Sequence, residues 1–373
     1  MEAPGRAIEQ YHRNMFNFDQ PNPRWIASCA AYLNSIIPGG VEGKRVVDYG
    51  FGRGNWSLAF VELGASQVIA IDASAHAVDR FSSFVNDKGI DNISVRLGNS
   101  DEEELQEDVD VVFLYGILHH VKRPVKLLET AARMCNERNG SIVVYSYNAD
   151  SLRQTIAEIC RSAVGTDMEK LRDLSLTLHP EARIRAMDDL TAPFVFFWNN
   201  SELQGMVEQV GLAPVAQVAD FAAFEGKSRA PEFEPYVLIA SPRSDKKLDA
   251  IAAHASPNLP DLAHLTALAD LVLVELHGED RVKFAVGLYN TSFAVQGASE
   301  FFERVFGLWR YLVQAALALD QEFRAERLPA STKSLFEATC QRPDNSDIPH
   351  RDGTYSDPES SLAALAMRGG FRL

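Results

Sequence analysis

The chain has 373 residues, of which 46% are hydrophobic and 23% are charged, so it can bury a core of ordinary size and wholesale disorder is excluded. Its 51 acidic and 36 basic residues give a formal net charge of −15, which argues against a general binder of nucleic acid or of anionic membranes. No stretch reaches the ~18 apolar residues of a spanning helix, and the N-terminus lacks the apolar core of a signal peptide, so we expect a cytoplasmic protein without a membrane partner.

The length predicts two or three domains. Residues 1–43 are aromatic and have a helical pattern that Pro21 and Pro23 interrupt. From residue 44 short apolar runs alternate with helical patterns. The runs predict strands within residues 44–50, 67–74, 92–100, 108–121 and 141–148, and the patterns between them predict helices at 55–64, 74–89 and 124–140. This alternation predicts a parallel sheet with helices on both faces.

The second half of the chain departs from the alternation. Residues 151–211 are mostly helical in pattern, and residues 214–225 and 233–241 predict a closing antiparallel pair of strands. A polar run after Pro242 marks a boundary. The extension at 243–373 is mainly helical in pattern, and its strongest amphipathic stretch would suit a helical cap, a dimerisation surface or a plain helical subdomain packed on the sheet.

The most informative motif is a glycine-rich turn between the first predicted strand and the first helix after it. Asp48 precedes Gly50, Gly52 and Gly54. Glycines at such a turn let backbone N–H groups approach a ligand closely, and the helix N-terminus adds partial positive charge. The next strand ends in Asp72, about twenty residues on, where a carboxylate can accept both hydroxyls of a ribose.

Two kinds of nucleotide cofactor fit this turn. A dinucleotide site would have the pattern Gly-x-Gly-x-x-Gly, but Asn55 stands where that pattern places its last glycine. The carboxylate of Asp48 would repel a pyrophosphate, whereas it suits the ammonium of an amino-acid cofactor.

Over residues 40–241 the chain resembles the class I S-adenosylmethionine (SAM) methyltransferases. The resemblance is carried, in the order of that family, by the segments VVDYGFGRG, VIAIDAS, DVDVVFLYGILHHVKRP, GSIVVYSY and WNNSELQGMVEQVGL. It implies a doubly wound, Rossmann-like α/β sheet of seven strands with SAM as cofactor. The domains would be a helical lid at 1–43, a SAM-binding domain at 44–242 with a substrate-side insert at 151–200, and a helical extension at 243–373.

The resemblance also implies roles for individual residues. Asp48 and the backbone of Gly50, Phe51, Gly52 and Gly54 would hold the methionine part of SAM, Asp72 the ribose, and Ala73, Asn99 and Ser100 the adenine, while Tyr115 would lie near the sulfonium and Tyr11 in the lid. Many relatives carry an acidic residue at the position of Asn99, but an amide can also pair with adenine.

Candidates for the chemistry follow the fourth and fifth strands. A neutral imidazole at His119 or His120 would take a proton from the acceptor, although the pair would equally serve to pack the loop. Tyr145 and Tyr147 alternate on the fifth strand, so one of them would face the substrate side and the other the core, and Tyr147 is the candidate. The cysteines Cys29, Cys135, Cys160 and Cys340 are far apart, and adjacent histidines make a poor metal pair, so we predict no metal site and no disulfides.

Three functions fit these motifs. The acidic charge and the insert favour a methyltransferase that acts on an O, N or C nucleophile of a small molecule. Because the motifs bind SAM without choosing which carbon reacts, the same fold could instead transfer or cyclise the aminocarboxypropyl group and release methylthioadenosine. The third is a non-catalytic SAM-binding protein.

Overall fold

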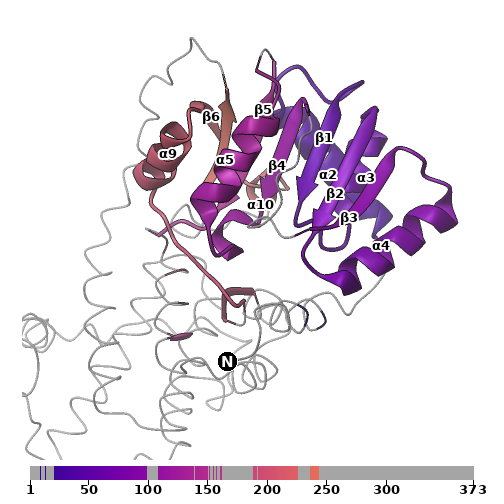
Figure 1. Cartoon of the computed structure of the whole chain (residues 1–373), viewed down its shortest axis with the longest axis horizontal. Helices are drawn as coiled ribbons and strands as arrows, with labels where there is room; N and C mark the ends of the chain where they lie inside the picture. Colours follow the sequence, from indigo (N-terminus) through magenta and orange to yellow (C-terminus); the bar gives the residue numbers. More distant parts are fainter. Residues whose placement is uncertain are drawn as a thin grey trace, which may run out of the picture. The chain divides into compact units, whose positions relative to one another are not determined.

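The computed structural model describes residues 9, 13, 21–98, 108–137, 139–149, 151, 154, 157, 160–161, 188–190, 192–225 and 236–242 (Figure 1). The chain divides into two compact units, one of Met1–Ser151 with Met187–Ser256 and one of Leu152–Ala186 with Pro257–Leu373. The elements below belong to the first unit. The predicted extension at 243–373, most of the insert at 151–200, and Tyr11, Asn99 and Ser100 lie outside the described residues.

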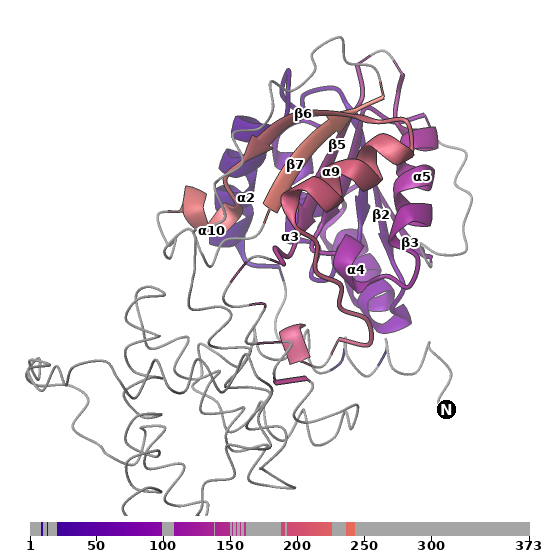
Figure 2. The ribbon, with the colours of Figure 1, turned by 90° about the vertical axis from the view of Figure 1, so that its left-hand side faces the viewer.

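Within the described residues, seven strands form one mixed sheet in the order β3-β2-β1-β4-β5-β7-β6 (Figure 2). They are β1 (Arg45–Tyr49), β2 (Gln67–Asp72), β3 (Ile93–Leu97), β4 (Val111–Tyr115), β5 (Ser141–Ser146), β6 (Ala213–Val218) and β7 (Tyr236–Ser241). β7 is antiparallel to both β5 and β6, and all other neighbours are parallel. The predicted parallel sheet with a closing antiparallel pair is confirmed.

Helices cover both faces of this sheet (Figure 2). On one face lie α2 (Pro23–Ile36), α3 (Asn55–Glu62), α4 (Ala75–Lys88) and the short α10 (Phe221–Phe224), and on the other lie α5 (Pro124–Met134) and α9 (Asn200–Gln209). The first layer buries residues such as Leu33, Phe60 and Phe81, and the second buries Leu127 and Leu203. The expected doubly wound α/β architecture is therefore confirmed.

Several helix ends follow the local chemistry that the sequence indicates. The hydroxyl of Ser74 accepts a hydrogen bond from the backbone N–H of Ala77, at 3.2 Å, and caps α4. Gly89 ends the same helix in the left-handed conformation, with φ +61°, and Pro124 begins α5. These residues determine where α4 begins and ends and where α5 begins.

Two predicted elements end earlier than expected. α5 ends at Met134 instead of reaching Gly140, because Cys135 is already extended and forms a bridge with Val109. The strand predicted at 214–225 ends at Val218, and α10 follows it. The carbonyl of Asp220 accepts the first bond of this helix from Phe224, and Asp is a favoured residue at that position.

The helix α2 belongs to the layer on the sheet. Tyr32 is 1% exposed, and its hydroxyl donates to the carbonyl of Ala219 at 2.7 Å. Asn22 caps α2 with its side chain, and its backbone N–H donates to the side chain of Asn55 in α3 at 3.0 Å. Residues 22–36 are thus fixed against the sheet. No helix among the described residues combines the length and apolarity that crossing a bilayer requires.

Candidate functional site

The described cofactor candidates lie at the carboxyl edge of the parallel strands, where the strand order reverses between β1 and β4. Asp48 on β1 is paired in register with Ala70 on β2 and with Phe113 on β4. Asp72 ends β2, and Tyr115 ends β4. Ligands of open α/β sheets bind at such a reversal point, so the topology places these side chains where a cofactor would be held.

The glycine-rich turn has a backbone that ordinary residues rarely adopt. Gly50, Gly52 and Gly54 all have positive φ angles, of 70°, 55° and 78°. Gly54 is the N-cap of α3, and a Cβ atom there would lie 2.1 Å from the ring of Phe81. Phe51 is buried, with its ring centroid 5.0 Å from that of Phe81.

Asp48 is a buried carboxyl, with 2% of its surface exposed. The hydroxyl of Ser57, in α3, donates to it at 2.6 Å. Burial raises the pKa of Asp48 to about 7; the bond from Ser57 partly counteracts the rise, and the nearby charge of Asp72 adds to it. The carboxyl is therefore poised between its two protonation states near neutral pH, and a cation beside it would favour the ionised form.

Asp72 links the glycine-rich turn to the start of α4. One carboxylate oxygen accepts the N–H of Gly52 at 3.0 Å, and the other accepts the N–H of Ser74 at 2.9 Å. The neighbouring Glu9 accepts the hydroxyl of Ser74 at 3.0 Å and the N–H of Ala75 at 2.5 Å. Glu9 therefore contacts the start of α4, directly beyond Asp72.

Tyr115 belongs to an aromatic cluster at the end of β4. Its ring centroid lies 4.5 Å from that of Tyr145 and 4.8 Å from that of Trp56. Its hydroxyl accepts the backbone N–H of Phe221 at 3.0 Å, and burial raises its pKa well above the ordinary value. The ring is therefore neutral and fixed in position, while its predicted place beside a sulfonium stays a prediction.

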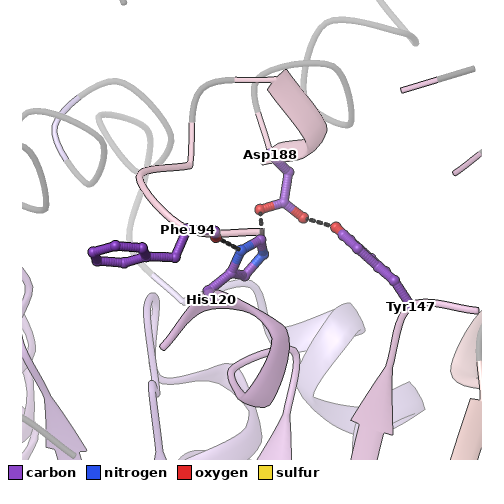
Figure 3. Close-up of polar contacts among 4 residues, drawn as sticks. All are labelled: His120, Tyr147, Asp188 and Phe194. Atoms are coloured by element: carbon purple, nitrogen blue, oxygen red, sulfur yellow. Dashed lines mark hydrogen bonds and ion pairs between the residues drawn. The ribbon is translucent and has the colours of Figure 1, made fainter. Parts of the chain in front are cut away.

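The catalytic candidates meet a carboxylate that sequence analysis did not identify (Figure 3). The hydroxyl of Tyr147 donates to one oxygen of Asp188. The other oxygen lies 3.2 Å from Nε2 of His120, whose Nδ1 lies 3.0 Å from the carbonyl oxygen of Phe194. The ring of His119 is buried and stacked on Tyr147, with centroids 3.8 Å apart.

The surroundings of His120 favour its charged form. Burial lowers the pKa of His120, but the charge of Asp188, its hydrogen bond and the carbonyl of Phe194 outweigh burial and raise the pKa overall. Each ring nitrogen faces an acceptor oxygen, so each must carry a proton to bond. In this arrangement His120 could act as a general base only after its contact with Asp188 is broken.

The segment 192–198 runs along the same edge. The backbone N–H of Phe196 donates to the carbonyl of His119 at 2.9 Å, and the N–H of Ala149 donates to the carbonyl of Trp198 at 3.1 Å. These bonds place a chain segment rich in aromatic residues across the ends of β4 and β5.

The structure thus brings most of the candidates to one edge: Asp48, Gly50, Phe51, Gly52, Gly54, Asp72, Ala73, Tyr115, His119, His120 and Tyr147. Sequence analysis missed Ser57, Glu9 and Asp188. Only Ser57 had a local signal, because it lies in the first turn of the helix that follows the glycines. Among the described residues, no group of three or more His, Cys, Asp or Glu side chains could hold a metal ion.

Comparisons with known proteins identify the family of the chain. A family model described as "Methyltransferase domain" matches residues 16–217, more than half of the chain. The rRNA N(6)-adenosine-methyltransferase Mettl5 of Drosophila melanogaster is 28% identical over 165 residues, which cover 40% of this chain and 75% of that protein.

The uncharacterized methyltransferase YcgJ of Bacillus subtilis is 28% identical over 104 residues, or 28% of this chain, and the match spans 41% of that relative's length. The solved structure of YcgJ aligns with a TM-score of 0.37 at 17% identity, covering 57% of this chain and 95% of YcgJ. The family model covers the glycine-rich turn, Asp72 and the ends of β4 and β5. The chain therefore belongs to the methyltransferase domain family and is a class I SAM-dependent methyltransferase, with S-adenosylmethionine as its cofactor.

Proposed function

We propose that the protein transfers the methyl group of SAM to an oxygen, nitrogen or carbon nucleophile of a small molecule. The observation that carries the proposal is the pair of buried carboxylates, Asp48 and Asp72, held beside a glycine-rich turn at the carboxyl edge. The formal net charge of −15 supports a small acceptor over a polyanion, because a polyanion would be repelled.

The residues present fit SAM. Asp48 can ionise to hold an ammonium, and it lies beside a turn whose glycines, Gly50, Gly52 and Gly54, have positive φ angles. Asp72 is a carboxylate, which can accept ribose hydroxyls, and it also accepts the N–H groups of Gly52 and Ser74. SAM supplies an electrophilic methyl group on its sulfonium.

We assign the adenine contacts to residues beyond Asp72. Ala73 follows the ribose carboxylate directly, and Asn99 and Ser100 follow β3 in the sequence. Tyr11 lies in the sequence between Glu9 and Arg13, and Glu9 contacts the start of α4. We therefore propose that Tyr11 belongs to a lid that covers the cofactor from the side of α4.

On the acceptor side, the protein's main task is to hold the two reactants in line. An acceptor that must lose a proton needs a base, and His119 is our first candidate, because both ring nitrogens of His120 already face oxygen atoms, of Phe194 and Asp188. Tyr147 would hold Asp188 in place by its hydrogen bond, and so would help to position the residues that face the acceptor.

A second candidate acceptor is RNA. It is favoured by one observation, the similarity to an rRNA methyltransferase over 40% of the chain. The two acceptor classes differ in charge, which makes them separable by fractionation.

The test uses the full chain with SAM and three separate acceptor pools: metabolites that pass a small-pore filter, total RNA and total protein. S-adenosylhomocysteine and methylthioadenosine are measured by mass spectrometry. We expect S-adenosylhomocysteine to form with the metabolite pool, together with a product heavier by one methyl group. Formation with RNA or protein alone would replace the small-molecule proposal.

A sample with SAM and no acceptor separates the remaining possibilities. Methylthioadenosine that accumulates over many turnovers would mean that the aminocarboxypropyl side of SAM reacts, which would contradict methyl transfer. Intact, bound SAM would support the need for an external acceptor. A chain that binds no SAM at micromolar concentration would contradict the assignment of the cofactor site.

A further inference from the structure

We propose that Asp188 is a positioning residue: through a charged pair with His120 and a hydrogen bond from Tyr147, it docks the segment 188–198 on the carboxyl edge of the sheet. If the proposed function holds, this segment is the acceptor-side wall of the SAM site, and the docking sets where an acceptor is held.

The three side chains come from separate parts of the chain. His120 lies in the short η1 helix (Leu118–His120) after β4, Tyr147 directly follows β5, and Asp188 comes from the chain that leads to segment 192–198 (Figure 3). His120 has 10% of its side chain exposed and Asp188 has 27%. The carboxylate of Asp188 therefore connects the segment that contains it to the ends of β4 and β5, through His120 and Tyr147.

The pair depends on charge. Among the described residues, the groups that face His120 include Asp188, the carbonyl of Phe194, the more distant charge of Asp189, and the rings of His119 at 4.1 Å and Tyr147 at 5.7 Å. Neutral His120 would turn a lone pair toward one of its two oxygen neighbours, which is repulsive. Removal of the Asp188 charge should therefore lower the pKa of His120, so the titration of His120 reports whether the pair exists.

The docking itself has separate reporters. The amide of Phe196 is bonded to His119, and the amide of Ala149 is bonded to Trp198. Both amides should exchange slowly with solvent while the segment is docked and faster once it is released.

The test compares Asp188→Asn, Asp188→Glu and a matched control, Glu208→Gln, which removes the same charge from an exposed position on α9. The histidine ring signals of the ligand-free full chain are followed by NMR between pH 5 and 9. The chain has nine histidines, and the signal of His120 is identified as the one that is lost in the His120→Gln variant. Hydrogen exchange is measured in peptides that cover 145–150 and 192–199, and SAM affinity is measured by calorimetry.

In Asp188→Asn we expect the pKa of His120 to fall, because the charge and the hydrogen bond of Asp188 are lost, and exchange at Phe196 and Ala149 to become about tenfold faster or more. Peptides from β1 and β2 should be unchanged, SAM affinity should change less than about threefold, and Asp188→Glu should restore part of both signals. The control should match the wild type.

The proposal is overturned if the titration of His120 and the exchange of both amides are the same in Asp188→Asn as in Glu208→Gln. It is also overturned if exchange rises equally in all peptides, which would indicate a general loss of stability. Should Asp188→Asn not fold, Tyr147→Phe removes one bond to the carboxylate without a change of charge, and it must raise exchange at Ala149 for the proposal to stand. Because His120 is read without SAM, a failure of the cofactor assignment would leave this result intact.

Discussion

At the scale of single residues, Asp72 should decide the affinity for SAM. A hydrogen bond to a charged group contributes about 1.5–3 kcal/mol, so Asp72→Ala should weaken SAM binding by about tenfold to a hundredfold. Calorimetric titration measures the change. Asp79→Ala, which removes an exposed carboxylate from α4, is the matched control and should leave the affinity unchanged. Equal affinities in the two variants would contradict the ribose assignment.

Asp48 should make SAM binding depend on pH. Its pKa is raised from 3.8 to about 7 by burial, so the stability that the protonated carboxyl contributes is full below pH 3.8 and is lost as pH rises through about 7. If an ammonium binds beside it, SAM must displace a proton near pH 6. Titrations in buffers of different ionisation enthalpy should detect this proton release in the wild type and not in Asp48→Asn.

The same shift predicts an effect on the ligand-free chain. Asp48→Asn removes a buried charge that must form above pH 7, so it should raise the free energy of unfolding more at pH 8 than at pH 5. Urea unfolding at both pH values measures this difference. A stabilisation that is the same at both pH values would mean that Asp48 does not titrate in this range.

At the scale of elements, the glycine-rich turn and α3 depend on one glycine for their packing. Gly54→Ala combines a strained positive φ with a Cβ atom 2.1 Å from Phe81, so we expect a loss of roughly 2–5 kcal/mol in the free energy of unfolding. Gly211→Ala has a similar φ of 82° but open space, and should cost about 1 kcal/mol. Urea unfolding of both variants measures the contrast, and similar losses would mean that the space beside Phe81 adjusts freely.

The elements also show what sequence reasoning can and cannot reach. The sequence predicts the helix ends at Ser74, Gly89 and Pro124, because capping and backbone preferences act within a few residues. The end of α5 at Met134 was missed because a bridge to Val109, far away in the chain, decides it.

The candidate site follows the same division. Asp48 and Asp72 stand at strand ends that periodicity reveals, so sequence reasoning finds them. Asp188 meets Tyr147 across 41 residues, and no local pattern marks a carboxylate that a distant hydroxyl will bond.

At the scale of the whole molecule, charge should separate the two acceptor classes before any product is identified. A protein that binds RNA through phosphate contacts loses affinity steeply as salt rises, and non-specific binding at physiological salt has a Kd of about 10⁻⁴–10⁻⁶ M. With a formal net charge of −15, the chain should bind a mixed-sequence RNA oligonucleotide more weakly than about 10⁻⁴ M in 0.15 M salt. Fluorescence anisotropy measures this, and SAM binding by the same sample shows that the protein is active. Binding in the micromolar range with a steep salt dependence would reveal a basic surface that the overall composition conceals, and RNA would then replace the small molecule as the proposed acceptor.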